Sequence, residues 1–335
     1  MSNIGAKYTD ERGQNYLEEH PVYKSTRRSS TREPIMKRAV SISLGSSKRD
    51  STVELDLLGQ RVCIQRIGTD GDMARAAALY SELDGQVDAF GVGGTDLGLT
   101  VDEKYYTLHS VAPLVRGVRR TPVVDGSGLK NTLERQVAPY MDAHIGHALS
   151  PRRVLMTSGA DRWGMSMSFM DNGYEGVFGD LMFGLGLPLP LRSAAAIKRV
   201  AAIILPVVSR LPFAWLYPTG EKQEKNTPKF GQWYDWATVI AGDCHFIKRF
   251  MPARLDGKII CTNTTTVADV AAFRAAGVRY LVTTTPRLEG RSFGTNMMEA
   301  MLVAVSGQGR KLTDAELSEM ITALDFRPNI EPLNI

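Results

Sequence analysis

The sequence predicts an α/β protein of two domains, in which a mixed α/β domain precedes one built on a parallel sheet. The chain has 335 residues, a length that suits roughly two domains. From Arg38 onward, short apolar runs alternate with segments of helical periodicity, which is the pattern of parallel strands joined by crossover helices. One run, VLMTSGADRWGMSMSF at residues 154–169, passes from a strand through a glycine turn into a helix.

The first domain is predicted over residues 37–150, after a polar segment at residues 1–36 that we expect to be a flexible extension. Period-two alternation and glycine turns predict its strands, two of which form a hairpin around Leu58-Gly59-Gln60. Helical spacing predicts its helices, with Asp70 or Asp72 capping the first of them. The predicted strands are 38–47, 51–59, 60–69, 87–94, 104–110 and 121–128. The predicted helices are 72–83, 111–120 and 131–148, the last kinked or restarted at Pro139.

The second domain is predicted over residues 151–300, followed by C-terminal helices over 301–335 that pack back toward the first domain. Its strands are short and apolar, as in a sheet that is covered by helices on both faces. The predicted strands are 152–159, 174–181, 236–243, 257–264 and 278–286, and the predicted helices include 160–173, 194–206 and 267–277. This order predicts a Rossmann-like, doubly wound parallel sheet.

Composition excludes several classes of function. The net charge is only +4, and most of that excess falls within the first 38 residues, so nucleic acid is not expected as a partner. Three cysteines without a C-x-x-C pair indicate a reducing compartment rather than a disulfide framework. His144 and His147 have no cysteine or acidic cluster beside them, so no metal site is predicted.

The longest apolar region, residues 194–217, is interrupted by charges and prolines and is too broken for a membrane span. The first 34 residues contain no apolar core of a signal peptide. We therefore expect a cytoplasmic protein that binds a small-molecule substrate and no membrane, with a homodimer as one possible assembly.

The glycine turn after the first strand of the second domain predicts a dinucleotide site. Gly159 can make the tight turn, and Gly164 can let the helix pack close to the strand. Asp180 follows about 20 residues later, where an acidic side chain accepts from the adenosine ribose. A carboxylate there favours NAD over NADP. Thr262 and Asn263 end a further strand at the same edge of the sheet and complete the predicted cofactor site.

Asp161 departs from the G-x-G-x-x-G pattern, because it occupies the middle glycine position. A carboxylate there adds bulk and repels a pyrophosphate. Arg162 can compensate by binding the pyrophosphate, or Asp161 can point away and cap the helix. The alternative is a doubly wound domain that binds no dinucleotide.

The segment VVDGSGLKNTLER, residues 123–135, lacks the spacing of a Walker phosphate loop. It resembles the shikimate/quinate 5-dehydrogenase family, in which an N-T-D-G-x-G segment starts the helix that leads into the nucleotide domain. Asp125-Gly126-Ser127-Gly128 matches D-G-x-G, whereas Val123 and Val124 replace Asn and Thr. Together, ISLGSSKRD and DGSGLKNTLER resemble the quinate 5-dehydrogenases of that family. The domain order also matches.

The resemblance implies an alcohol–ketone interconversion on a polyhydroxylated ring acid, with a lysine–aspartate pair that moves the proton. Asp125 matches the aspartate of that family by position. The family's N-V-T-x-P-x-K segment is absent, so Lys130, Lys104 and Lys48 are the available amines, and Lys130 lies nearest to Asp125 in sequence. Lys130 is equally compatible with an exposed position on the helix, and Asp125 with a turn.

Substrate contacts are predicted from two further segments that resemble this family. SISLGSSKRD resembles its serine-rich carboxylate-binding segment, with Ser46, Ser47 and Lys48 as candidates and Arg49 as an aid. FGTNMMEAMLVAVSG resembles its late helix, which supplies Asn296 and carries Glu299 where that family has glutamine. Asp96, in the loop after a predicted strand, is a further candidate.

The leading prediction is an NAD-dependent oxidoreductase. An acyl or aldehyde reductase on the same plan needs a reactive cysteine, and neither Cys63 nor Cys261 has a persuasive setting. Cys244 stands beside His245 at a strand end, but neighbouring strand residues point to opposite faces and would rarely pair. The third reading is a non-catalytic ligand-binding or assembly protein on a degenerate Rossmann architecture, and Asp161 favours it most.

Overall fold

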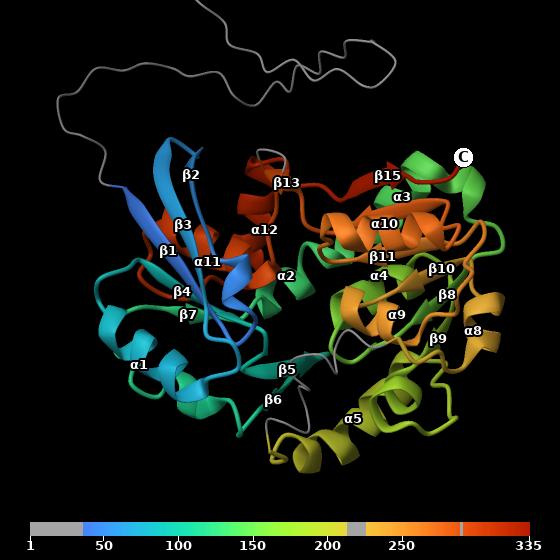
Figure 1. Ribbon diagram of the computed structural model, residues 1–335, viewed down its shortest axis with the longest axis horizontal. Helices are drawn as coiled ribbons and strands as arrows, with labels where there is room; N and C mark the ends of the chain where they lie inside the picture. The colour runs from blue at the N-terminus through green and yellow to red at the C-terminus, as the bar shows by residue number, and fades with distance from the viewer. Residues whose placement is uncertain (1–35, 213–225, 289–290) are drawn as a thin grey trace, which may run out of the picture. The chain divides into compact units, whose positions relative to one another are not determined.

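A computed structural model describes residues 36–212, 226–288 and 291–335 of the chain, and residues 35–335 form one compact unit (Figure 1). The extension predicted over residues 1–36 lies outside the described residues, except for Met36. The predicted α/β class is confirmed, because both main sheets contain parallel strands connected through helices. Within the described ranges, no helix is both long enough and apolar enough to cross a membrane.

The first sheet has five strands in the order β2-β3-β1-β4-β7. Their bounds are β1 Lys37–Ser43, β2 Ser51–Leu57, β3 Gln60–Gly68, β4 Ala89–Gly93 and β7 Val123–Val124. All neighbouring pairs are parallel except β2 with β3, which form the predicted hairpin. Leu58 and Gly59 turn this hairpin with positive φ values of 49° and 75°.

The second sheet has six strands in the order β15-β12-β11-β10-β8-β9. Their bounds are β8 Arg153–Met156, β9 Glu175–Phe178, β10 Val239–Ala241, β11 Ile259–Thr262, β12 Tyr280–Thr283 and β15 Asn329–Pro332. Only β15 is antiparallel to its neighbour. The chain first adds β9 on one side of β8 and then β10 on the other. Strand order therefore reverses beside β8, and ligands of such sheets bind at a reversal of this kind.

Helices cover both faces of the second sheet. Successive strand residues point to opposite faces, so each strand contributes side chains to two cores. Val154 and Met156 face one core, while Leu155 between them faces the other. The first face is covered by α3 Val137–Ile145, α4 Trp163–Asp171 and α5 Ala194–Val208. The second face is covered by α8 Gly231–Trp236, α9 Cys244–Phe250 and α10 Val267–Ala275. The sheet is doubly wound, as predicted.

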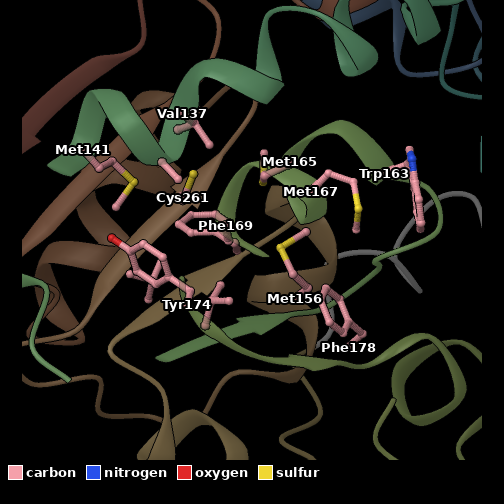
Figure 2. Packing of buried hydrophobic residues seen from close by; sticks show 14 of the residues in the cluster. Val137, Met141, Met156, Trp163, Met165, Met167, Phe169, Tyr174, Phe178 and Cys261 are labelled. Atoms are coloured by element: carbon pink, nitrogen blue, oxygen red, sulfur yellow. The ribbon is translucent and has the colours of Figure 1, made fainter. Parts of the chain in front are cut away.

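Figure 2 shows the core on the α3 and α4 side of this sheet, where methionines and aromatic rings interleave. Phe169 of α4 meets Tyr174 edge to face, with ring centroids 5.0 Å apart. Met156 of β8 and Cys261 of β11 point into the same core from the sheet. Thioether side chains adapt to irregular gaps, so this packing fixes α4 on the strand that precedes it.

The first sheet is covered by α1 (Met73–Leu83) on one face and by α11 (Thr295–Ser306) on the other. Asp72 caps α1, which resolves the choice left by the sequence. Helix α11 lies along β1 and β4 (Figure 1) and is joined in that core by α12 (Asp314–Ala323). The chain then returns to the second sheet as β15.

The single helix predicted over residues 131–148 is wrong. The chain instead forms α2 (Ser127–Asn131), a 3-10 turn at Glu134–Gln136, and α3. A new helix does start beside Pro139, as one of the two outcomes predicted for it. Pro139 lies in the first turn of α3, where an amide lacks an intrahelical acceptor, so proline is tolerated there. The amide of Ala138 donates to the Ser168 hydroxyl of α4 at 2.9 Å, which fixes this start.

The helix predicted over residues 111–120 is also wrong beyond a 3-10 turn at Ala112–Val115. The amides of Arg119, Arg120 and Thr121 donate to the carboxylate of Asp84, so a side chain replaces the helical carbonyl acceptors. A small hairpin, β5 (Gly98–Val101) and β6 (Lys104–Thr107), lies between β4 and this turn. Two short strands, β13 (Arg287–Leu288) and β14 (Arg291–Ser292), form another.

Candidate functional site

Lys130 of α2 joins loops that leave the carboxyl ends of both sheets. Its Nζ lies 2.8 Å from Asp96 Oδ1, in the loop after β4, and 2.8 Å from Asp161 Oδ1, in the turn after β8. The Lys130 side chain is only 8% exposed. Parallel sheets bind ligands at the carboxyl ends of their strands, so this ammonium lies where the ligand edges of the two sheets meet.

The predicted pairing of Lys130 with Asp125 is replaced by these two contacts. Asp125 Oδ2 accepts from the amide of Leu97 at 2.7 Å, and its Oδ1 accepts from the amide of Ser127 at 3.1 Å and from the Ser127 hydroxyl. Asp125 therefore ties the base of the β5–β6 hairpin to the start of α2. It fixes the loop that carries Asp96 relative to the helix that carries Lys130.

The carboxyl groups of Asp96 and Asp161 have opposite pKa shifts. Burial raises the pKa of Asp96 to about 7, and the negative charges of Asp161 and Asp125 add to the effect. Burial alone would raise the pKa of Asp161, but Lys130 and Arg162 outweigh it and hold the pKa at about 2. A hydrogen bond with Asp96 also stabilises ionised Asp161. Two carboxyl groups with separated pKa values are the signature of an acid–base centre.

Lys130 itself stays charged. Burial alone would lower the pKa of its ammonium, but the carboxylates of Asp161 and Asp96 outweigh burial and raise the pKa above its usual value. Of the three groups, Asp96 is therefore the one that can gain and lose a proton near neutral pH. Lys130 is suited to stabilising negative charge that develops beside it.

Arg162, predicted to bind the cofactor, is buried among three carboxylates. It forms ion pairs with Glu134, with Asp243 Oδ2 at 3.2 Å, and with Asp161 Oδ2 at 3.4 Å. Within the described part of the chain, its Nε and Glu134 Oε2 are buried without a hydrogen-bond partner. The guanidinium holds Asp161 in place and connects the turn after β8 to the loop after β10.

The structure brings Gly159 and Asp180 together, as the fingerprint predicts. Asp180 accepts from the amides of Gly159 and Ala160 at 3.1 and 2.8 Å. A β-carbon on Gly159 would lie 3.0 Å from Asp180 Oδ2, so glycine permits the approach. Burial raises the pKa of Asp180, and the two amides oppose that shift.

These residues fit the adenosine end of NAD. Each carboxylate oxygen of Asp180 accepts one amide and keeps further acceptor capacity for a ribose hydroxyl. Helix α4 starts after Arg162 without a side-chain cap, and the residues of its first turn, Trp163 to Met165, are buried. Asp161 is turned onto Lys130, so its charge is neutralised within the protein.

Gly164 allows a close approach of two helices. A β-carbon there would lie 2.0 Å from the carbonyl oxygen of Lys130, so α4 packs directly on α2. The sequence predicts that Gly164 lets α4 pack close to its preceding strand. In the structure, Gly164 instead lets α4 pack close to α2.

The other predicted cofactor residues, Thr262 and Asn263, bond to each other and to their neighbours. Thr262 donates to Asn263 Oδ1 at 3.1 Å, and the carbonyl of Asn263 accepts from the Thr285 hydroxyl at 2.8 Å. Thr262 and Asn263 lie at the carboxyl end of β11, beside β12, and no described contact connects them to Lys130.

The predicted substrate residues are divided between two places. Ser46, Ser47 and Lys48 form the 3-10 turn after β1, where Ser46 Oγ accepts from the amide of Lys48 and Ser47 N donates to Asp70. Asn296, in the first turn of α11, donates to Ser41 Oγ at 2.6 Å. The backbone nitrogen of Asn296 would lie 2.8 Å from a β-carbon on Gly126, beside the turn that contains Asp125. Only Asn296 and Asp96 lie near α2.

Two acidic residues of this region, Glu134 and Asp243, were not assigned to the site from the sequence, whereas Glu299 was noted there as a replacement for the glutamine of the resembled family. Glu134 and Asp243 bind Arg162, and Glu299 of α11 contacts α2. Glu134 lies among polar residues, so its surroundings in the sequence give no signal of burial. Among the described residues, no group of three or more histidine, cysteine or acidic side chains can hold a metal ion.

Two family models together match most of the chain. One, described as "Domain of unknown function (DUF8754)", matches residues 128–333, more than half of the sequence. Another, described as "Domain of unknown function (DUF8753)", matches residues 38–125. No curated protein matches the sequence.

Solved structures show low similarity to this chain. A crystal structure from Mycobacterium smegmatis is 12% identical, covers 89% of this chain and 91% of its own, and has a TM-score of 0.32. NAD-dependent malic enzyme from Thermotoga maritima is 14% identical, with coverages of 89% and 79% and a TM-score of 0.38. A structure from Mycobacterium smegmatis in complex with β-D-fucofuranose is 12% identical, with coverages of 88% and 99% and a TM-score of 0.29. With TM-scores this low, we draw no function from these structures.

Proposed function

The chain belongs to the family described as "Domain of unknown function (DUF8754)", and we propose that it is an NAD-dependent oxidoreductase. The proposed reaction interconverts an alcohol and a ketone on a small polyhydroxylated acid. The observation that supports this most is the buried Lys130 ammonium between Asp96 and Asp161, at the carboxyl ends of both sheets. Such a centre offers a proton acceptor beside a fixed positive charge.

In the proposed reaction, ionised Asp96 accepts the proton of the substrate hydroxyl, and protonated Asp96 returns it to the ketone oxygen in reverse. A pKa near 7 suits transfer in both directions at neutral pH. Lys130 stays protonated and stabilises the negative charge on the substrate oxygen. Asp161 keeps Lys130 in place and remains ionised throughout.

The chemistry that NAD supplies when bound is hydride transfer at the carbinol carbon. Asp180 is proposed to bind the adenosine ribose of NAD. The carboxylate of Asp180 disfavours a 2′-phosphate, so we propose NAD rather than NADP. The D-G-x-G resemblance at Asp125–Gly128 supports a quinate- or shikimate-like substrate.

A second candidate, a non-catalytic ligand-binding protein, is favoured by the Arg162 cluster. Lys130 and Arg162 are both engaged by the protein's own carboxylates, and structural ion networks also shift pKa values. The reductase alternative has less support. Burial raises the pKa of Cys63, Cys244 and Cys261, which makes each thiol a poor nucleophile.

Calorimetric titration with NAD and NADP tests the proposal before any substrate is known. We expect saturable NAD binding, weaker NADP binding, and loss of NAD affinity in Asp180→Ala. Asp171→Asn at the exposed far end of α4 is the matched control. Turnover of quinate and shikimate with NAD is then measured in the wild type and in Asp96→Asn.

Absence of NAD binding at millimolar concentration would reject the oxidoreductase and favour the non-catalytic candidate. Binding of NAD that is unaffected by Asp180→Ala would place the cofactor elsewhere on the protein.

A further inference from the structure

Glu299 is the only charged residue of α11, and it is buried in the core between the first sheet and α12. Burying a carboxyl group in an apolar helix is unfavourable unless its oxygens are bonded. The partner lies on α2, since Glu299 Oε2 accepts from the amide of Gly128 at 3.0 Å. The contact joins positions far apart in sequence.

The fit between Glu299 and α2 depends on a glycine. A β-carbon on Gly128 would lie 3.0 Å from Glu299 Oε1 and 2.5 Å from Leu317 Cδ1 of α12. A side chain there would displace the carboxyl group or α12. Glu299 therefore supplies the acceptor, and the glycine at position 128 leaves the space that its carboxyl group occupies.

The first amide of α2, that of Ser127, donates to Asp125 Oδ1 at 3.1 Å. The residue between them, Gly126, has φ of 94° and no side chain to accept from the amides that follow in the helix. Amides of a first helical turn need an acceptor from outside the helix. Glu299 of α11 supplies that acceptor for the amide of Gly128, which lies two residues before Lys130.

We propose that Glu299 is a positioning residue for the Lys130 centre: it anchors the first turn of α2 and so sets where Lys130 meets Asp96 and Asp161. This inference rests on the proposed function, because it takes the Lys130 centre as the acid–base site. Glu299 does not touch the reacting atoms in this assignment. Its effect on the reaction passes through α2.

The groups around Glu299 determine which substitution is conservative. Burial raises the pKa of Glu299 to about 8, and the charge of Asp125 at the end of β7 adds to this. The Gly128 and Leu129 amides of α2 and the charge of Lys311, after α11, oppose the shift. Leu317 of α12 is apolar. Glutamine, which is neutral and retains an acceptor oxygen, is therefore the conservative replacement near pH 7.

The test follows the carboxyl group of Asp96 by NMR in full-length protein labelled with 13C-aspartate, with Asp96→Asn identifying its signal. In Glu299→Ala, loss of the anchor moves Lys130 away from Asp96, so ionised Asp96 is less stabilised. We expect its titration midpoint to rise by about one pH unit, a tenfold change in acidity. In Glu299→Gln the midpoint stays at the wild-type value.

Met301→Ala is the matched control, because Met301 is fully buried in the same helix and core but has no carboxyl oxygen to accept from the Gly128 amide. We expect it to lower the melting temperature without moving the Asp96 midpoint. Glu299→Met retains most of the side-chain volume without an acceptor, and replaces Glu299→Ala if that variant does not fold.

A midpoint that shifts no more in Glu299→Ala or Glu299→Met than in Met301→Ala would overturn the positioning role. This comparison holds whatever the wild-type midpoint is. The proposed function is judged separately, since a wild-type Asp96 midpoint far below 7 would count against the acid–base centre itself.

Discussion

Gly164 of α4 faces the carbonyl oxygen of Lys130 so closely that a β-carbon would lie 2.0 Å from it. The helix that follows the Gly159 turn and the helix that carries the candidate catalytic lysine are thus in backbone contact. This contact fixes Lys130 relative to Asp161, which lies three residues before Gly164.

Gly164→Ala is expected to separate these two helices. Overpacking of a tight contact destabilises proteins by about 1–3 kcal/mol, and chemical denaturation measures the change. Gly146→Ala is the control, because no atom lies within 4 Å of its β-carbon position. Equal stability of the two variants would show that α2 and α4 can move apart freely.

Arg162→Met is expected to destabilise the fold strongly, because it leaves Glu134 buried without its partner. Removal of one member of a buried ion pair destabilises by about 3–5 kcal/mol. The double variant Arg162→Met/Glu134→Gln should recover part of this loss. Additive losses in the denaturation free energies would mean that the pair is not coupled.

Asp96→Asn should remove the proton acceptor of the proposed reaction. General acid–base groups contribute about 10²–10⁴-fold to rate, so kcat/KM should fall within that range. In the direction of alcohol oxidation, the wild-type rate should rise with pH through about 7, where Asp96 ionises. The variant should lack this rise, whereas Asp102→Asn, an exposed residue of the β5–β6 turn, should retain it.

Glu299→Gln should change how stability depends on pH. The pKa of Glu299 is about 8 in the folded chain against a usual 4.5, so folding retains a proton that the unfolded chain releases. The resulting stability is fully present below pH 4.5 and is lost as pH rises through 8. Relative to the wild type, the variant should become more stable as pH increases from 5 to 9. Parallel thermal-melting profiles of the two proteins would refute this.

The sequence predicts the layers of this fold well because they depend on local pattern. The Leu58-Gly59 hairpin and the alternation of Val154, Leu155 and Met156 follow from turn chemistry and a period of two. The prediction of one helix over residues 131–148 was wrong, although helical spacing of apolar residues runs through the whole segment. The break before α3 depends on contacts with other parts of the fold, which the spacing does not reveal. Ser168, from another helix, bonds to the amide that starts α3.

Local sequence patterns predict the candidate site less well than the fold. The sequence places Asp96 and Asp161 after strands, but it does not show that loops of two different sheets meet at Lys130. Asp161 departs from the glycine pattern, and its lysine partner becomes evident only in three dimensions. The assignment of Asp125 as a catalytic group stays a prediction, as do those of Ser46, Ser47, Lys48, Thr262 and Asn263.

Helix α11 has a consequence for how the two matched segments can be inherited. It belongs to the segment matched over residues 128–333, yet it lies against β1 and β4 of the segment matched over 38–125. A gene that encoded the later segment alone would produce a protein with an uncovered apolar helix, prone to aggregation. The two segments are therefore expected to occur together, either fused in one chain or as separate chains that fold only as a complex.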